Sequence, residues 1–457
     1  MKTKIILASL CLLCAATLRA QDTTKEPIPE PAQPSLWSLT DCIEYAQKNN
    51  ISVQQRALNV EDGRVQLSTA RFSRLPDLNA SLGANASFGR GLSRDNTYVE
   101  ANQLSGSLGI SASMPVFQGM RIKKQIEGSK LNLAAAVQDL ERVREDVSIN
   151  VMTLYLQVLF NKELVGVAQK QLDLSTRQTE RSRQLVATGK NPESALYESE
   201  ALQAKDELNL TQSRNELTLS LLNLSQALNR EEATGFDVQI PVFDSLTLGA
   251  MAGLGSPEAV YDYAAENRPH VKAEKLRLQS SETSVRIAKA SLYPSISLSG
   301  GYGTNLYKSY ATGSLNTDFW SQFRNNGNEY VGLSVHIPIF NRRATRNNIR
   351  SAQISMRSQS LALINAQQAL RKEIEQAYYN ADAAYGKYRS ADKALASARI
   401  AFTYEQRKAD AGRSTIFDYN DAKTRMEKAE SELIQSKYDF IFRSKILDYY
   451  KGVPITL

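Results

Sequence analysis

One long stretch of this sequence, residues 114–190, occurs a second time further along the chain. The first copy begins MPVFQGMRIKKQ and ends LVATGK, and the second begins IPIFNRRATRNN and ends ADAGR. Three pairs of positions are all 223 residues apart: Pro115 and Pro338, Tyr155 and Tyr378, Gly189 and Gly412. Because the offset is constant, no net insertion or deletion distinguishes the two copies, and the two must fold into structures of equal length.

Both copies have the pattern of one uninterrupted helix. Neither contains another proline before its glycine, and apolar residues recur at intervals of three and four. In the first copy this stripe comprises Val137, Leu140, Val143, Val147, Val151, Leu154 and Val158. We predict long helices at residues 119–188 and 342–411, each about 100 Å long at a rise of 1.5 Å per residue. After each glycine, which favours a left-handed cap, we predict a returning helix, at residues 192–229 and 415–451.

The segment before each long helix has the period of a β-strand. Paired shorter helices end before Pro76 and Pro294, and from there apolar residues alternate with Ser, Gly and Asn. This alternation predicts strands at about residues 77–90, 104–116, 295–307 and 329–339. A soluble sheet can alternate in the same way, but the polar face here has scarcely a charge, which is typical of a wet barrel lumen.

Two further features favour a membrane barrel. The strands are close to the roughly 9–11 residues that a tilted strand needs to cross a bilayer. Aromatic residues gather near the strand ends and in one loop: Tyr302, Tyr307, Tyr310, Phe319, Trp320, Phe323 and Tyr330. Four strands cannot close a barrel, since the smallest known have about eight, and open sheet edges in lipid leave backbone groups unpaired. We therefore expect the chain to oligomerise, and a conducting pore favours three or more copies.

The predicted fold is mixed, with tandem-duplicated long α-helical hairpins joined to strands of a membrane β-barrel. The chain divides into a signal peptide (1–20), a flexible proline-rich leader (21–36), a first repeat (37–230), a connecting segment (231–255) and a second repeat (256–457). Removing the signal peptide removes three basic residues and no acid, so the formal net charge falls from +7 to +4. This charge is too small for so long a chain to indicate a nucleic-acid partner.

The sequence is poor in catalytic groups, and we predict no enzyme activity. Its two histidines, His270 and His336, lack the neighbouring Cys or Glu-x-x-His pattern of a metal site, so we expect no metal. The glycines of residues 299–303 lie within a predicted strand and do not lead into a phosphate-binding helix. No nucleotide-binding motif occurs, so we expect no cofactor and an energy source outside this chain.

One polar constellation, at the second helical tip, has a plausible task. It consists of Arg413, Asp418 and Asp421, and the two acids are three positions apart at the start of the returning helix. They can serve as helix caps, with Thr415 and Asp418 forming a capping box. In a symmetric assembly they would instead form a ring of carboxylates, which is a cation-binding constriction or gate. The first tip carries Ala195 and Glu198 at the equivalent positions, so the tips are not interchangeable.

These features together resemble the TolC family of bacterial outer-membrane efflux proteins, over nearly the whole chain from about residue 37 to 452. The resemblance rests on the duplication, on the paired strand-to-helix junctions PVF (115–117) and PIF (338–340), and on the tip sequence GRSTIFDYND (412–421). It implies a homotrimer with one twelve-stranded barrel in the lipid of the outer membrane and a helical tunnel in the periplasm. This chain departs from the family pattern at Ser414, where relatives carry a basic residue.

The resemblance also implies docking of a periplasmic adaptor protein and an inner-membrane transporter. The hairpin tips would make this contact, through Ala187, Thr188, Gly189, Ala411 and Gly412, and Asp418 and Asp421 would line the closed entrance. The predicted function is a passive exit duct of a tripartite efflux system that exports small molecules. A duct for secreted proteins or peptides (type I secretion) and a coiled-coil envelope protein without a pore remain as alternatives, although the matched strands argue against the latter.

Overall fold

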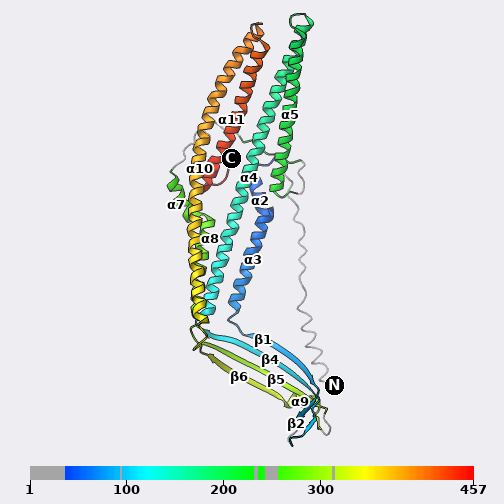
Figure 1. The fold of residues 1–457 in the computed structure, drawn as a ribbon, viewed down its shortest axis with the longest axis vertical. Helices are drawn as coiled ribbons and strands as arrows, with labels where there is room; N and C mark the ends of the chain where they lie inside the picture. Colours follow the sequence, from blue (N-terminus) through cyan, green and yellow to red (C-terminus); the bar gives the residue numbers. More distant parts are fainter. Residues whose placement is uncertain (1–35, 93–94, 231–234, 242–255, 311–313, 457) are drawn as a thin grey trace.

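The computed structural model describes residues 36–92, 95–230, 235–241, 256–310 and 314–456. The predicted signal peptide, nearly all of the leader and most of the connecting segment therefore lie outside the described residues. The chain is strongly elongated, with a curved sheet at one end and the tips of two helical hairpins at the other (Figure 1). The N-terminal half and the C-terminal half run side by side along the long axis.

Each half contains one long helix and one returning helix, and these have equal lengths in the two halves. The long helices α4 (Arg121–Ala187) and α10 (Ala344–Asp410) have 67 residues each. The returning helices α5 (Glu193–Ala227) and α11 (Ile416–Tyr450) have 35 residues each. All four begin and end within two residues of the predicted positions, which is the ordinary uncertainty of a helix end.

Shorter helices precede the strands in each half. They are α2 (Leu39–Asn49) and α3 (Ile51–Phe72) in the first half, and α7 (Pro257–Asn267) and α8 (Pro269–Ala290) in the second. Ser38 caps α2 in a complete capping box with Asp41, and Ser256 caps α7 by accepting a hydrogen bond from the Ala259 amide. The helices thus begin where the cap residues stand in the sequence.

The sheet has four antiparallel strands in the order β1-β4-β5-β6. Their bounds are β1 (Asp77–Ser87), β4 (Gln103–Gln118), β5 (Ser295–Ser309) and β6 (Gly327–His336). The centre of the sheet joins the two halves of the chain, since β4 pairs with β5. The two outer strands, β1 and β6, each have one edge without a partner among the described strands.

Two predicted strands were too long at their second ends. We predicted that the first extends to residue 90, but β1 ends at Ser87. We predicted that the last extends to residue 339, but β6 ends at His336, which pairs with Ser295 at the start of β5. Residues beyond His336 therefore have no opposing residue on β5. The equivalent residues of the first half, 114–116, stay within β4 because β4 pairs with β5 down to Gln118, across an irregularity between Pro115 and Phe117.

The same backbone turn joins a strand to a long helix in both halves. Gly119 and Met120 precede α4 with φ values of 60° and 67°, and Arg342 and Arg343 precede α10 with φ values of 53° and 64°. These are left-handed conformations that non-glycine residues rarely adopt. In the first half a side chain at Gly119 would also come within 2.7 Å of the Ala290 carbonyl oxygen, so only glycine fits there.

The main core lies midway along the helices and joins both halves. It includes Tyr155 of α4, Trp37, Val238 and Phe440, all of which are buried. Tyr155 donates a hydrogen bond of 2.6 Å to the Gln239 carbonyl oxygen, which fastens the described part of the connecting segment to α4. Among the described residues, one helix, α4, contains an 18-residue window that is long and apolar enough to cross a membrane by length and composition, and half of that window is buried inside the chain.

The loops at the far end of the sheet contain elements that the sequence did not predict. A small hairpin is formed by β2 (Arg90–Leu92) and β3 (Tyr98–Glu100), and a short helix, α9 (Phe319–Asn325), lies between β5 and β6. Both lie at the end of the strands that is remote from the helices (Figure 1).

Candidate functional site

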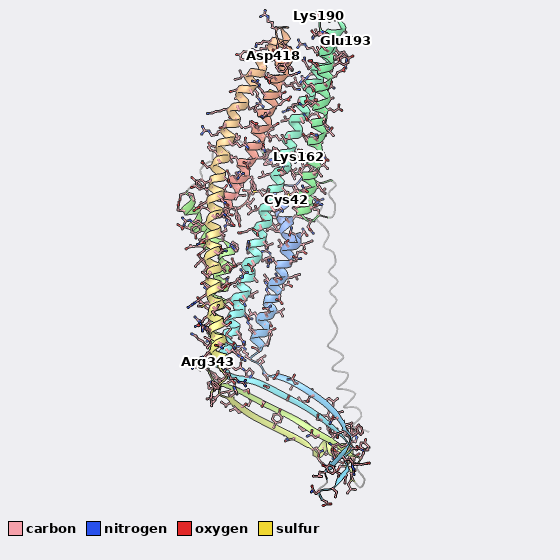
Figure 2. All side chains as sticks on the ribbon, in the orientation of Figure 1. Cys42, Lys162, Lys190, Glu193, Arg343 and Asp418 are labelled. Carbon is pink, nitrogen blue, oxygen red and sulfur yellow. The ribbon has the colours of Figure 1, made fainter. Side chains whose placement is uncertain are left out.

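The two helical tips share one backbone design. Gly189 and Gly412 both have a φ of 70°, which is the left-handed conformation of a helix-ending glycine. In each tip the glycine amide and the following amide donate to carbonyl oxygens of the last helical turn, over 2.8–3.1 Å, in a Schellman motif. The predicted contact residues Ala411 and Gly412 are exposed, as are Thr188 and Gly189. Ala187 is exposed as well. Figure 2 labels Lys190 and Asp418, which lie at the two tips.

At the second tip, both aspartates lie on the surface of the first turns of α11. Thr415 accepts a hydrogen bond from the Asp418 amide at 3.1 Å and donates one to the Asp418 carboxylate at 2.6 Å. Asp421 forms an ion pair with Arg425 at 2.7 Å. Thr415 is therefore the N-cap of α11, and the predicted capping box with Asp418 is only half formed, because the Asp418 carboxylate bonds to the Thr415 hydroxyl and not to its backbone amide. Both acids are exposed.

The structure does not bring Arg413 into contact with these two acids. Its side chain is exposed, and its backbone amide donates to the Lys408 carbonyl oxygen as part of the helix-ending motif. The basic partner of Asp421 is Arg425, which our sequence reasoning missed. Its position four residues further along the same helix is the spacing of a helical ion pair and could have revealed it.

A second charged contact near the tips joins the two hairpins. Arg181 of α4 forms an ion pair with Asp410 at the end of α10. Both side chains are about half exposed, so this pair contributes little to stability, typically below about 1 kcal/mol. It nevertheless marks a place where the long helices of the two hairpins are in direct contact.

A buried charge cluster lies further from the tips, between the returning helices. Lys423 of α11 is 1% exposed and Asp206 of α5 is 2% exposed, and their charged atoms are 2.8 Å apart. Glu427 lies one turn along α11, with its carboxylate 3.3 Å from the Lys423 ammonium. Burial, which outweighs the nearby Lys423 charge, raises the pKa of Glu427 above its ordinary value. The cluster joins the two hairpins through one buried ammonium.

We expect Glu427→Gln to raise the melting temperature at pH 7.5 and to leave it unchanged near pH 4. A carboxyl whose pKa is raised in the folded protein binds a proton more readily there than in the unfolded chain, so stability falls as pH rises through that range. Glutamine carries no charge, so Glu427→Gln removes the free-energy cost of burying a carboxylate at pH values where Glu427 is ionised. Thermal melts followed by circular dichroism at both pH values test this, and a lower melting temperature at pH 7.5 would contradict it.

The strand faces can be assigned from the register. Ser81, Gly109 and Gly303 stand opposite one another across β1, β4 and β5, and the next rows on that face, toward the helices, are also small or polar. The opposite face carries rows such as Leu82, Leu108 and Thr304. The predicted separation into an apolar and a small polar face therefore holds in these rows of β1, β4 and β5. On β6, Glu329 stands on the apolar face opposite Tyr302, and Tyr330 stands on the polar face opposite Gly301. His336 lies at the helix end of the polar face, opposite Ser295.

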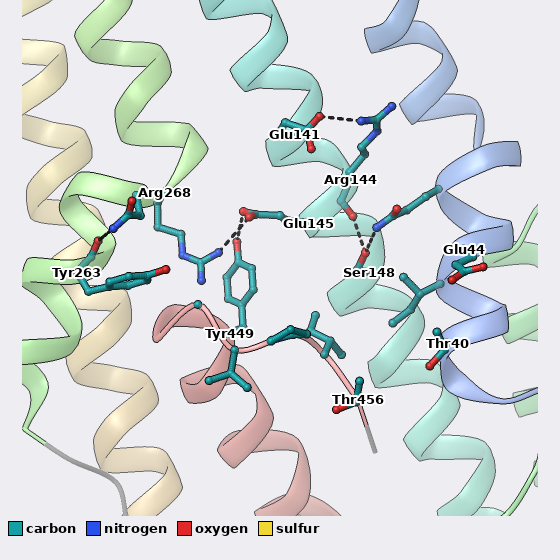
Figure 3. Close-up of a pocket in the computed structure, with 17 residues that line it drawn as sticks. Thr40, Glu44, Glu141, Arg144, Glu145, Ser148, Tyr263, Arg268, Tyr449 and Thr456 are labelled. Atoms are coloured by element: carbon teal, nitrogen blue, oxygen red, sulfur yellow. Dashed lines mark hydrogen bonds and ion pairs between the residues drawn. The ribbon is translucent and has the colours of Figure 1, made fainter.

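A pocket of about 590 Å³ lies midway along the helices, at the junction of the two halves (Figure 3). Arg268 forms an ion pair with Glu145 at 3.1 Å and lies 3.7 Å from the centre of the Tyr449 ring. Tyr449 in turn donates a hydrogen bond of 2.7 Å to Glu145. These contacts hold α4, α11 and the junction between α7 and α8 together, and they contain no nucleophile paired with a base.

The described residues contain no cluster of metal-ligating side chains. No three His, Cys, Asp or Glu side chains come together there in a way that could hold an ion. His270 lies in the first turn of α8, with its ring Nδ1 3.1 Å from an Arg142 guanidinium nitrogen. Burial and this neighbouring cation lower the pKa of His270.

The sequence matches one family model along both halves. The model describes outer membrane efflux proteins and matches residues 42–230 and 260–444. A relative of similar length is the outer membrane efflux protein BepC of Brucella suis biovar 1. It is 20% identical over 451 residues, which cover 97% of this chain and 89% of the relative.

Solved structures of outer membrane proteins have the same fold. The outer membrane protein VceC of Vibrio cholerae aligns with a TM-score of 0.74 at 16% identity, over 91% of this chain and 96% of its own. The CmeC outer membrane channel of Campylobacter jejuni also aligns with a TM-score of 0.74 at 16% identity, over 94% and 90% of the two chains. The duplication, the sheet, the hairpins and the family match agree, and the chain belongs to the family of outer membrane efflux proteins.

Proposed function

We propose that three copies of this chain form one duct across the outer membrane and the periplasm, through which small molecules leave the cell passively. The observation that carries the proposal is the incomplete sheet at the end of two equal hairpins. The outer edges of β1 and β6 carry backbone N–H and C=O groups without a strand partner among the described residues, and such groups are costly in lipid. Pairing of β6 with β1 of the next copy supplies hydrogen-bond partners to both edges. Three copies give twelve strands and a lumen lined by the polar face.

The equal helices support a continuous tunnel. Both hairpins start at the same sheet and have the same lengths, so their tips reach one plane. Three copies then place six hairpin tips around one axis. This duct performs no bond chemistry of its own. An inner-membrane transporter, linked through a periplasmic adaptor, supplies the energy, and the class of that transporter decides between efflux of small molecules and secretion of peptides.

The exposed tips are the surface that we assign to the adaptor. A photo-cross-linking amino acid at Thr188 or Ala411 is expected to capture one periplasmic protein in intact cells. The same amino acid at Thr424, which is exposed on α11 away from the tip, is the matched control and is expected to capture much less of it. Equal capture from the tips and from Thr424 would contradict this assignment.

We assign the gate to Asp418 and Asp421. In the trimer these residues form a ring of six carboxylates, which attracts cations into the narrow end of the tunnel. The double substitution Asp418→Ala with Asp421→Ala is expected to lower cation selectivity and the block by multivalent cations in single-channel recordings. Glu198→Ala, at the equivalent position of the first tip, is the control. Unchanged selectivity in the double variant would leave Asp418 only its contact with the N-cap Thr415.

A further inference from the structure

A groove on the apolar face of the sheet lies near the end that is remote from the helices. Across β1, β4 and β5, the residues Ala84, Gly106 and Leu306 stand in one row, and Leu104 and Lys308 stand in the next. The register places both rows on the face that carries Leu82 and Leu108, which is opposite to the serine-rich face. In a barrel with a polar lumen, this face contacts lipid.

Helix α9 is fastened beside the groove by side-chain amides that replace a missing strand. β5 pairs with β6 only as far as Thr304, but continues to Ser309. Along this unpaired edge the Gln322 side-chain amide makes two hydrogen bonds with the backbone of Tyr307. It accepts from the Tyr307 N–H at 2.7 Å and donates to the Tyr307 carbonyl oxygen at 2.8 Å. The Asn316 amide bonds both backbone groups of Ser309, each at 2.7 Å, and Asn326 donates to the Asn305 carbonyl oxygen at 2.6 Å. The edge is thereby satisfied where no strand covers it.

These bonds place α9 partly over the apolar face. Thr304, which belongs to that face, is 2% exposed and donates a hydrogen bond to the Phe323 carbonyl oxygen at 3.4 Å. Phe319 and Trp320 have large exposed rings, whose centres are 5.3 Å apart. A short helix with exposed aromatic rings on the lipid side of a barrel has the chemistry of a membrane interface.

The groove has a volume of about 460 Å³ and lies between α9 and the strands. Its apolar wall includes Leu104, Leu306 and Phe319, and Lys308 stands at its outer end. The apolar band of β5 runs from Ile296 to Leu306, about the 9–11 residues that cross a bilayer, so Lys308 lies just beyond the hydrocarbon.

Within the described chain no carboxylate pairs with Lys308, whose ammonium lies 5.3 Å from the centre of the Tyr310 ring. Asp318, also in the wall, accepts hydrogen bonds from the Trp320 and Ser321 amides.

We propose that this groove is a binding site for one membrane lipid with an anionic phosphate headgroup. An acyl chain lies along Leu104, Leu306 and Phe319, and the phosphate is paired with the Lys308 ammonium. The groove lies on the face of the two inner strands, β4 and β5, and reaches Ala84 of the outer strand β1. Assembly joins the strands edge to edge, so it leaves this face of the sheet open to lipid. This inference rests on the proposed duct, because only a barrel in a membrane presents the groove to lipid.

The test uses the fluorescence of Trp320 in the full-length protein inserted into vesicles. The chain has two tryptophans, and Trp37 is buried in the helical core, so a Trp320→Phe variant supplies its background signal. Phosphatidylglycerol with brominated acyl chains, added as a minor component to phosphatidylcholine, is compared with an equal amount of brominated phosphatidylcholine. We expect the anionic lipid to bind about fivefold more tightly, as judged by quenching, which is the effect of one basic residue at a membrane surface.

Two variants identify the site. Lys308→Gln is expected to make the apparent affinities for the two lipids equal. Arg324→Gln, which changes a charge on α9 outside the groove, is expected to keep the preference for the anionic lipid. If the wild-type protein binds both lipids with equal affinity, or if the preference for the anionic lipid survives Lys308→Gln, the proposed binding site is wrong. Vesicle flotation and channel conductance are measured on the same samples. A protein that inserts and conducts without lipid preference contradicts the groove alone, and one that does not insert contradicts the duct as well.

Discussion

Replacing Lys423 by alanine is expected to cost about 3–5 kcal/mol of stability, the usual cost of removing one partner from a buried ion pair. Lys423 is 1% exposed and pairs with Asp206, so its removal leaves a carboxylate buried without a counter-charge. The two hairpins lose their buried charged link at the same time. The free energy of unfolding, measured by denaturant titration of the purified protein, tests this expectation.

Two comparisons isolate the cause. Lys428→Ala changes an exposed lysine of the same helix, and such surface changes typically stay within about 0.5 kcal/mol. Lys423→Met combined with Asp206→Asn removes both charges, and we expect it to recover much of the loss, because a buried pair contributes little beyond an apolar replacement. A double variant as unstable as Lys423→Ala would show that packing, and not the unpaired charge, causes the effect.

Covalently joining positions 181 and 410 is expected to hold the duct closed. The native Arg181–Asp410 pair is half exposed and weak, so Asp410→Ala alone should change stability by less than about 1 kcal/mol. A cross-link cannot break as an ion pair does, and opening requires the hairpins to separate near their tips. With Arg181→Cys and Asp410→Cys, a bifunctional methanethiosulfonate reagent should abolish export, and a reductant should restore it.

The native cysteine of the helical core does not interfere with this experiment. Cys42 is buried, and burial together with the nearby Asp41 raises the pKa of its thiol to about 12, so it stays protonated and unreactive at neutral pH. The untreated double variant and the reagent-treated wild type are the controls. Normal export by the fully cross-linked protein would contradict an opening that separates α4 from α10 at this level.

The helical architecture could be predicted because its signals are local and repeated. The apolar period, the absence of proline and the glycines at positions 189 and 412 determined each long helix to within two residues. The strands followed from the change of period after Pro76 and Pro294. The error at the end of β6 arose because strand ends depend on a partner, and the partner, β5, begins at Ser295.

The charged and amide contacts could not be predicted, because they join distant residues with no periodic signal. Lys423 and Asp206 are 217 positions apart, and in sequence both look like ordinary residues on a helix surface. The first copy has Glu200 where the second has Lys423, so the duplication gives no hint of the pair. The seven residues of α9 are too few to show a helical period of apolar residues. The side-chain amides of Asn316 and Gln322 bond to backbone groups, so the sequence contains no complementary side chain that would reveal these contacts.

Single-channel recording of the purified protein in planar bilayers tests the central claim most directly. A trimeric duct should give discrete, long-lived, cation-selective channels without nucleotide or any other energy source, from a species with the mass of three chains. Channels of that kind would support one barrel closed by three four-stranded sheets. Absence of channels from protein that is trimeric and inserted, or channels from a species of one chain, would contradict it.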